Sequence, residues 1–384
     1  MIPLSVPNIT GNAWGYVKEC LDTGWVSSAG AFVDRFEEGF RAATGASHAV
    51  ACVNGTAALQ VALRVAGVAP GDEVLVPTVT FIATVNAARY LGAVPVFMDS
   101  DRHFNLDVDK VREFLRERTE RREGATFNRG SGRRIAAIVP VHVFGNAARL
   151  AELLEPCRAG GIAIIEDAAE SLGTYYLEGP LAGRHTGTIG LLGCFSFNGN
   201  KIITTGGGGM IVTNDDEVAR YARYLTTQAK DDEVRFVHGD VGYNYRLTNL
   251  QAALGIAQLE ALPAFLEHKR TNFRHYQDAI AQIEGLELPD GPPYARNNHW
   301  FYPLQVDVER YGRDREALMA DLGAEGIQTR PMWQLNHRQP PYLHHERYRI
   351  DTALVQHQCT LCLPCSTNLT PSEIERVCDG LRRG

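Results

Sequence analysis

Short apolar runs alternate with amphipathic stretches through the first two-thirds of the chain. The runs, each flanked by turn residues, occupy positions 73–77, 94–98, 135–141, 161–165 and 209–213. Before the first of them, residues 56–65 repeat their apolar positions at helical spacing. Runs that are apolar throughout are typical of strands buried on both faces, as in a mostly parallel sheet covered by helices. The pattern therefore predicts an α/β fold whose ligands bind at the strand ends.

The pattern changes near residue 250, where a long helix is predicted. Thr248 or Asn249 can cap its start, and apolar residues follow at helical spacing as far as Leu262. A strand over 300–308, a helix over 315–325 and a last helix that begins at Pro371, capped by Thr370, come next.

These elements divide the chain into two predicted domains. We expect a large domain of residues 1–250 and a small α/β domain of residues 251–384, with the N-terminal segment as a candidate to pack on the small one.

The composition limits the classes of function. The chain has 384 residues, 45% of them hydrophobic, and a formal net charge of −7, with a pI of about 6.0. This charge balance gives no indication of a nucleic-acid partner. The first residues lack the pattern of a signal peptide, and no apolar run reaches the roughly 20 residues of a transmembrane helix. We expect a cytoplasmic protein with no membrane or nucleic-acid partner.

Residues 112–134 break the strand–helix alternation. They are dense in Arg and Glu, and then in glycine and polar residues. Charges of mixed sign are usually solvated, so we predict a helix end and a surface loop. The alternative is a basic patch that faces a phosphate.

Three of the eight cysteines form the run Cys359-x-x-Cys362-x-x-Cys365. Such spacing occurs in iron–sulfur and zinc sites, but no second pair of this type is present to complete one. Leucine and proline fill the gaps as in a buried strand, so we expect buried structural thiols and no metal.

Lys201 is the main candidate for chemistry. It follows the aromatic run Phe195-Ser196-Phe197 and precedes four consecutive glycines, 206–209. Consecutive glycines let a flat ligand or a second chain approach the backbone closely. A lysine there can form a Schiff base if its surroundings keep the amine neutral. The alternative is a surface lysine beside a flexible loop.

Three other segments carry chemistry that such a lysine needs. Gly55 and Thr56 open a predicted helix, whose free N–H groups can bind phosphate, although Thr56 could be a plain cap. Asp167 follows a buried apolar run, and a carboxylate there needs a partner such as a protonated pyridine nitrogen, unless it caps a helix. Phe81, just after a strand end, can stack on a flat ring or belong to the core.

Together, four segments resemble the DegT-type nucleotide-sugar aminotransferases. They are residues 54–59, 166–170, 196–201 and 242–246. These are pyridoxal-phosphate (PLP) enzymes of the aspartate-aminotransferase fold, fold type I. The resemblance spans essentially the whole chain. It implies a mostly parallel seven-stranded sheet in the large domain and a smaller α/β C-terminal domain.

The resemblance also implies residue roles. Lys201 would be the catalytic residue, holding the cofactor as a Schiff base and moving protons. The cofactor would further be bound by Gly55, Thr56 and Ser196 at its phosphate, by Phe81 and Asp167 at its ring, and by Glu170 near the ring hydroxyl. Ala57 would also belong to the cofactor-binding residues. Asn244 would reach the phosphate in the partner subunit, so the active sites would be shared within a homodimer.

Glu170 looks like the branch that includes both the GDP-perosamine synthases and the LegC-like enzymes, and the stretch 195–209 with the insertion before Ile135 looks most like the LegC-like group. That group aminates C4 of UDP-linked 2-acetamido-4-keto-2,4,6-trideoxy hexoses in surface-glycan or nonulosonic acid routes, with L-glutamate as the donor. GDP-perosamine synthases and aminotransferases of eight-carbon keto sugar acids are the alternatives. Substrate candidates are His299, Phe301, Arg330 and Trp333, with the neighbouring Trp300, although each could be a core aromatic or a surface charge.

Two relatives with other functions remain as rivals. One dehydrates a sugar at C3 and has histidine in place of Lys201. The other is a non-catalytic sensor, which we expect to lack Lys201, Asp167 or Asn244. All three residues are present.

Overall fold

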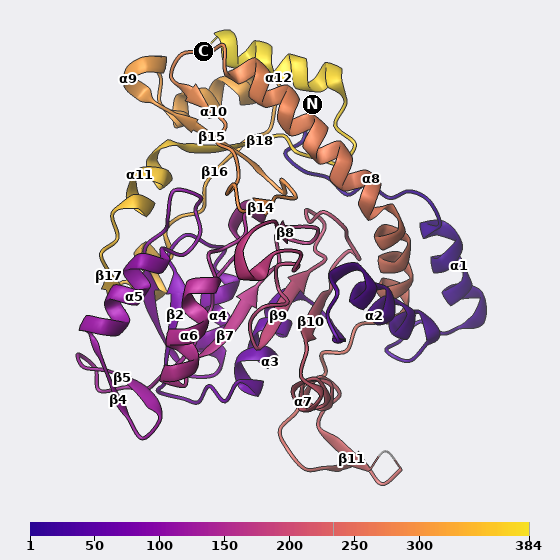
Figure 1. Ribbon diagram of the computed structural model, residues 1–384. Helices are drawn as coiled ribbons and strands as arrows, with labels where there is room; N and C mark the ends of the chain where they lie inside the picture. The colour runs from indigo at the N-terminus through magenta and orange to yellow at the C-terminus, as the bar shows by residue number, and fades with distance from the viewer. Residues whose placement is uncertain (233, 384) are drawn as a thin grey trace.

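The computed structural model describes residues 1–232 and 234–383. Its largest feature is an eight-stranded sheet (Figure 1). In spatial order the strands are β1 (His48–Cys52), β10 (Gly209–Thr213), β9 (Leu192–Ser196), β7 (Ala163–Asp167), β6 (Ile135–Ile138), β2 (Glu73–Pro77), β3 (Val94–Met98) and β17 (Arg347–Tyr348). The strands from β9 to β17 are parallel, whereas β10 runs antiparallel to both of its neighbours.

Seven of these strands come from the first two-thirds of the chain, as predicted. The eighth, β17, corrects the expected number. It pairs Arg347 with Phe97 and Tyr348 with Met98. A two-residue strand that pairs across about 250 positions leaves no periodic signal in the sequence.

Both faces of the sheet are covered by apolar side chains, so alternate residues of one strand are buried on opposite sides. In β2, Val74 and Val76 belong to one apolar cluster, while Leu75 between them belongs to another. The surrounding helices are α2 (Ala31–Thr44), α3 (Gly55–Val65), α4 (Ala83–Tyr90), α5 (Val108–Glu117), α6 (Ala151–Gly160) and α7 (Asp216–Thr226). The runs of consecutive apolar residues thus reflect two-sided burial.

The C-terminal third contains a four-stranded antiparallel sheet. Its order is β13 (Leu286–Glu287), β15 (Tyr302–Val306), β18 (Thr360–Leu363) and β16 (Arg330–Pro331). The helices of this part are α8 (Asn249–Ile280), α9 (Val308–Tyr311), α10 (Arg315–Ala324), α11 (Thr352–Cys359) and α12 (Pro371–Arg383). Figure 1 shows α8 running from beside α1 (Ala13–Thr23) and α2 to α12.

The N-cap of α8 is Thr248, one of the two predicted residues. Its hydroxyl accepts a hydrogen bond from the backbone N–H of Gln251 in a capping box.

The N-terminal segment contacts the C-terminal third of the chain. Ile2 forms a β-bridge with Ile327, and Leu4 O accepts a hydrogen bond from Cys365 N–H at 2.7 Å. A domain boundary near residue 250 remains a prediction.

The charged segment 112–134 is not the loop that we predicted. It contains a hairpin of β4 (Thr119–Arg122) and β5 (Ala125–Asn128). Its arginines pair with nearby carboxylates, for example Arg134 with Asp72 and Arg122 with Glu120. Two further antiparallel pairs of strands are β8 (Tyr175–Tyr176) with the distant β14 (Ala295–Arg296), and β11 (Lys230–Asp232) with β12 (Val237–His238).

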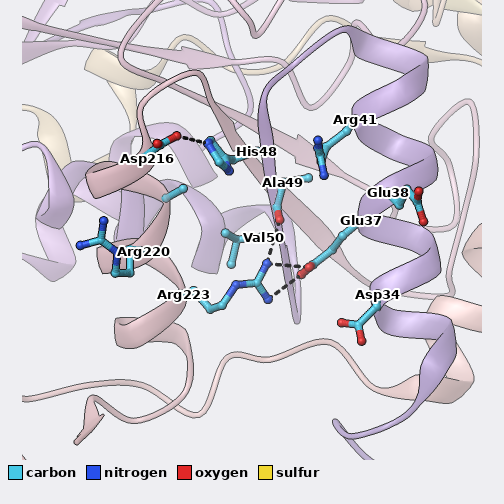
Figure 2. Close-up of a pocket in the computed structure, with 11 residues that line it drawn as sticks. Asp34, Glu37, Glu38, Arg41, His48, Ala49, Val50, Asp216, Arg220 and Arg223 are labelled. Atoms are coloured by element: carbon cyan, nitrogen blue, oxygen red, sulfur yellow. Dashed lines mark hydrogen bonds and ion pairs between the residues drawn. The ribbon is translucent and has the colours of Figure 1, made fainter.

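Strand β1 forms one edge of the large sheet, and side chains cover its free edge. Figure 2 shows the cavity of about 370 Å³ between α2 and α7 where this happens. Glu37 accepts from Ala51 N–H at 2.8 Å and pairs with Arg223 at 2.6 Å. Arg223 in turn donates to Ala49 O at 3.1 Å. The edge groups are therefore already bonded, which blocks pairing with another strand.

Candidate active site

A cavity of about 640 Å³ lies at the carboxyl ends of the parallel strands. Its walls come from both halves of the chain. Most of the predicted site residues line it together, namely Gly55, Thr56, Phe81, Asp167, Glu170, Ser196, Lys201, Phe301, Arg330 and Trp333. The α/β topology explains this convergence, since adjacent parallel strands end at one edge of the sheet.

Asp167 is the last residue of β7 and is buried, with 5% of its surface exposed. Its Oδ2 accepts a hydrogen bond from Thr84 Oγ1 at 2.6 Å, and Oδ1 accepts from Ala169 N–H at 3.1 Å. Burial raises the pKa of Asp167, while these hydrogen bonds and the charge of Lys201 oppose that rise. The two hydrogen bonds thus fix the direction of the carboxylate, and among residues 1–232 and 234–383 it forms no ion pair.

Beside Asp167, Glu166 forms a separate, fully buried pair with His142 at 2.9 Å. His142 Nδ1 accepts from Ala148 N–H at 3.0 Å, so the proton lies on Nε2, which donates to Glu166. Three backbone N–H groups also donate to this carboxylate, from Gly187, Ile189 and Gly190. Burial acts to raise the pKa of Glu166, but His142 and these donors together lower it.

The start of α3 forms one end of the cavity. Asn54 caps the helix, because its side chain accepts from Ala57 N–H at 2.8 Å. Thr56 is therefore not the cap, and its hydroxyl is available to a ligand. A Cβ on Gly55 would lie 2.8 Å from the Cβ of Ser196, so only glycine permits this close approach.

The structure differs from the prediction for Ala57, which was expected to bind the cofactor. Ala57 does not line the cavity, and its N–H donates to the side chain of Asn54. The free N–H groups at the helix start and the hydroxyls of Thr56 and Ser196 form a site suited to phosphate.

Lys201 lines the same cavity and contacts Trp300 of the C-terminal half. Its Nζ is 3.9 Å from the ring centroid of Trp300, whose Nε1–H donates to Asn200 O at 2.7 Å. Burial lowers the pKa of Lys201, and the carboxylates of Glu170 and Asp167 act against that shift. A lowered pKa increases the fraction of neutral amine, which is the nucleophilic form.

Glu170 lies under the same cavity, and burial raises its pKa to about 7. Its Oε2 accepts a hydrogen bond from Phe144 N–H at 2.8 Å. Phe144 has a left-handed φ of 56° and stacks on Trp333 at 5.2 Å between centroids. Glu170 therefore supports the turn whose aromatic ring backs the wall of the cavity.

Two predicted residues lie elsewhere. His299 lines a narrower cavity and stacks on Phe273 at 4.0 Å. His299 has a left-handed φ of 52°, and its N–H donates to Asn297 Oδ1, whereas Phe301 lines both this cavity and the main one. Burial lowers the pKa of His299 to about 3. Asn244 is exposed and does not line the main cavity of its own subunit.

Several lining residues were missed by the sequence analysis. They are Leu4, Thr80, Thr84, Asn198, Asn200, Pro331 and Cys362. Thr80 and Thr84 lie on either side of Phe81 in the sequence. Two hydroxyl residues just after a predicted strand were the signal that could have indicated these lining residues. Cys362 is buried in β18, and no group of three metal-ligating side chains occurs in residues 1–232 and 234–383.

The residues fit a flat aldehyde cofactor that carries a phosphate. The start of α3 with Ser196 suits the phosphate, and Asp167 is a buried acceptor for a protonated ring nitrogen. Lys201 supplies the amine, and Phe81, 56% exposed at the cavity, can cover a ring face.

Comparison with known proteins decides the family. The sequence profile of the DegT/DnrJ/EryC1/StrS aminotransferase family matches residues 7–382. The chain belongs to this family. This DegT-family protein has fold type I and is a PLP-dependent sugar aminotransferase. None of its helices in the described residues is both long enough and apolar enough to cross a membrane.

Named relatives agree with this assignment. The DegT-family chain is 39% identical to the GDP-perosamine synthase of Caulobacter vibrioides over 381 residues, covering 98% of this chain and 96% of that protein. It is 37% identical to the putative PLP-dependent aminotransferase EpsN of Bacillus subtilis over 389 residues, covering 99% and 95%. The crystal structure of DesI with its TDP-sugar product superposes with a TM-score of 0.87 at 29% identity, covering 100% and 92%.

Proposed function

We propose that this enzyme transfers the amino group of L-glutamate to C4 of a GDP-linked 4-keto-6-deoxyhexose. The observation that carries the proposal is that Lys201 and Asp167 line the main cavity together with Trp333 and Arg330. The similarity to a GDP-perosamine synthase supports the nucleotide. It favours the alternative over the UDP-linked 2-acetamido sugar of the LegC-like branch.

In this proposal the chain's own residues hold the cofactor at both ends. Gly55, Thr56 and Ser196 bind its phosphate, Phe81 covers its ring, and Asp167 pairs with its ring nitrogen. When bound, PLP supplies an aldehyde that accepts the amino group and a ring that stabilises negative charge. Glu170 lies near the ring hydroxyl.

Lys201 has two tasks. Its Nζ holds the cofactor covalently in the resting enzyme. When not bound to the cofactor, the neutral Nζ would remove the proton from the α-carbon of the donor, and in the second half of the reaction the protonated Nζ would deliver a proton to C4 of the sugar. The lowered pKa of Lys201 suits this use, because the free base is needed for the first transfer.

The C-terminal half supplies the substrate end. Trp300, Phe301 and Trp333 form an aromatic wall suited to the apolar face of a sugar ring. Arg330 is exposed at this cavity, and its Nη1 donates to Thr329 O at 2.8 Å. In the described part of the chain it forms no ion pair with a carboxylate, so its charge suits the diphosphate of the nucleotide.

Asn244 is proposed to act across a homodimer. It is exposed on its own subunit and follows the β11–β12 hairpin, which projects from the body of the molecule (Figure 1). By the resemblance, it would donate to the cofactor phosphate of the partner subunit, so that each site needs two chains.

A substrate panel tests the function. The purified enzyme with PLP and L-glutamate is incubated separately with GDP-, UDP- and TDP-linked 4-keto-6-deoxy sugars and with an eight-carbon keto sugar acid, and products are identified by mass spectrometry. We expect the amino sugar to form fastest from the GDP-linked substrate. Preferential turnover of the UDP-linked 2-acetamido sugar would overturn the choice of nucleotide, and absence of any amino-sugar product would overturn the proposal.

A further inference from the structure

A short chain of hydroxyl groups leads from the buried carboxylate of Asp167 into the loop before α4. Thr84 Oγ1 lies 2.6 Å from Asp167 Oδ2, and Thr80 Oγ1 lies 3.1 Å from Thr84 Oγ1. Both threonines are buried and line the main cavity.

The direction of these hydrogen bonds follows from their chemistry. An ionised carboxylate only accepts, so the single hydroxyl proton of Thr84 is donated to Asp167. Thr84 can then only accept from Thr80, whose other acceptor, Phe81 O, lies farther away at 3.4 Å. Hydrogen bonds in such a series polarise and strengthen one another.

The loop before α4, which carries Thr80, is held by hydrogen bonds from the C-terminal half of the chain. The side-chain amide of Asn336 donates to Thr80 O at 2.7 Å and to Thr78 O at 3.2 Å. The backbone N–H of Asn336 donates to Thr78 O as well, at 3.0 Å. The anchored loop therefore places Phe81 at the cavity and leads directly into α4, whose second residue, Thr84, contacts Asp167.

We propose that Thr84, supported by Thr80, is a positioning residue that keeps the Asp167 carboxylate ionised and aimed at the ring nitrogen of the cofactor. The proposal rests on the role proposed above for Asp167. Neither threonine is required to touch the reacting atoms. Their effect passes through the carboxylate.

The balance of charges around Asp167 shows why this support matters. Burial raises the pKa of Asp167, and the Thr84 hydroxyl is the largest of the groups that oppose it. The other ionisable groups that interact with this carboxylate are Lys201, His142, Glu170 and Cys194. Removing the hydroxyl should raise the pKa of Asp167 further, so the acid limb of cofactor binding should move to higher pH.

The test measures binding without covalent attachment. Pyridoxamine 5′-phosphate cannot link to Lys201, so its Kd for the apo-protein reports the contacts of the ring and phosphate alone. We expect Thr84→Val to weaken this binding by about tenfold to a hundredfold, with its acid limb moved to higher pH. Thr84→Ser, which keeps the hydroxyl, should bind as the wild type does, and Thr80→Val should give a smaller loss.

Two controls separate this role from a structural one. Inorganic phosphate, which has no ring, should protect the apo-protein against thermal unfolding equally in the wild type and in Thr84→Val. Asp167→Asn tests the proposed role of the carboxylate itself. Weak binding by Asp167→Asn with unchanged binding by Thr84→Val overturns the hydroxyl chain alone. Unchanged binding by Asp167→Asn overturns the assignment of Asp167 and, with it, this inference. Weak binding by Thr84→Ser would also overturn it.

Discussion

The carboxylate of Glu170 accepts a hydrogen bond from the backbone N–H of Phe144 at 2.8 Å. Phe144 has a backbone φ in the left-handed region, and its ring stacks on Trp333. The charge state of Glu170 and the shape of the substrate end are therefore linked through one backbone group.

Glu170→Gln should make the free energy of unfolding of the apo-protein less dependent on pH. The pKa of Glu170 is about 7 in the folded chain, above the 4.5 of an unperturbed glutamate. The folded state thus binds the extra proton, and the wild type loses stability as pH rises from about 4.5 to about 7. The loss is at most about 3 kcal/mol. Asp101, whose pKa is also raised, to about 6, remains in the variant, so urea unfolding at several pH values should show a steeper decline in the wild type than in Glu170→Gln. A parallel decline in both proteins would contradict it.

Glu166→Ala should destabilise the fold strongly. The change leaves the Nε2–H of His142 and three backbone N–H groups buried without their acceptor, and each unsatisfied group costs about 1–3 kcal/mol. The exposed Glu178 provides a matched control, and its change to alanine should alter stability by no more than about 0.5 kcal/mol. The pKa of Glu166 is lowered, so the stability it contributes is present above pH about 4.5 and is lost as pH falls through the folded pKa. Equal denaturation midpoints for the two variants would refute this account of the pair.

Arg330→Ala should raise KM for the nucleotide sugar about tenfold or more, since a charged hydrogen bond to phosphate is worth about 1.5–3 kcal/mol. The half-reaction with L-glutamate, followed in a single turnover, should keep its rate because the donor carries no diphosphate. Arg338 is also exposed but does not line the cavity, so Arg338→Ala should behave as the wild type. Equal effects of Arg330→Ala on both half-reactions would argue against a diphosphate contact.

Mixing two inactive variants tests the shared site. If Asn244 acts on the partner's cofactor, a hybrid of a Lys201→Ala chain and an Asn244→Ala chain contains one site with both residues intact. Refolding the two variants together should therefore restore part of the activity, whereas each alone stays inactive. If Asn244 served its own subunit, both sites of every hybrid would be defective and no activity would return.

Sequence patterns predicted the centre of the site because its residues lie at the ends of recognisable elements. Asp167 ends β7, Ser196 ends β9, and these two strands are neighbours in the sheet. Gly55 and Thr56 begin the helix α3, which starts at the same edge. Strand ends and helix starts can be located from periodicity, and the topology then brings them together.

Features that depend on tertiary contacts could not be predicted in this way. Thr84 and Asp167 meet across 83 positions. The direction of His299 depends on a left-handed backbone that its sequence neighbours do not indicate. The cap of α3 is Asn54, although the hydroxyl of Thr56 was an equally reasonable choice from the sequence. In each case a specific contact between distant or neighbouring side chains decides between two locally acceptable arrangements.

The covalent attachment of PLP to Lys201 is the central claim, and reductive trapping tests it most directly. The holoenzyme is treated with borohydride, digested and mapped by mass spectrometry. Lys269 is the internal comparison. It is buried, with a pKa lowered to about 8, but it donates to Trp300 O and Cys365 O and does not line the main cavity. The account predicts a pyridoxyl group on Lys201 and none on the Lys201→Ala protein, which should also make no amino sugar. A pyridoxyl group on Lys269 or another lysine of the wild type, or retained turnover by Lys201→Ala, would contradict the account.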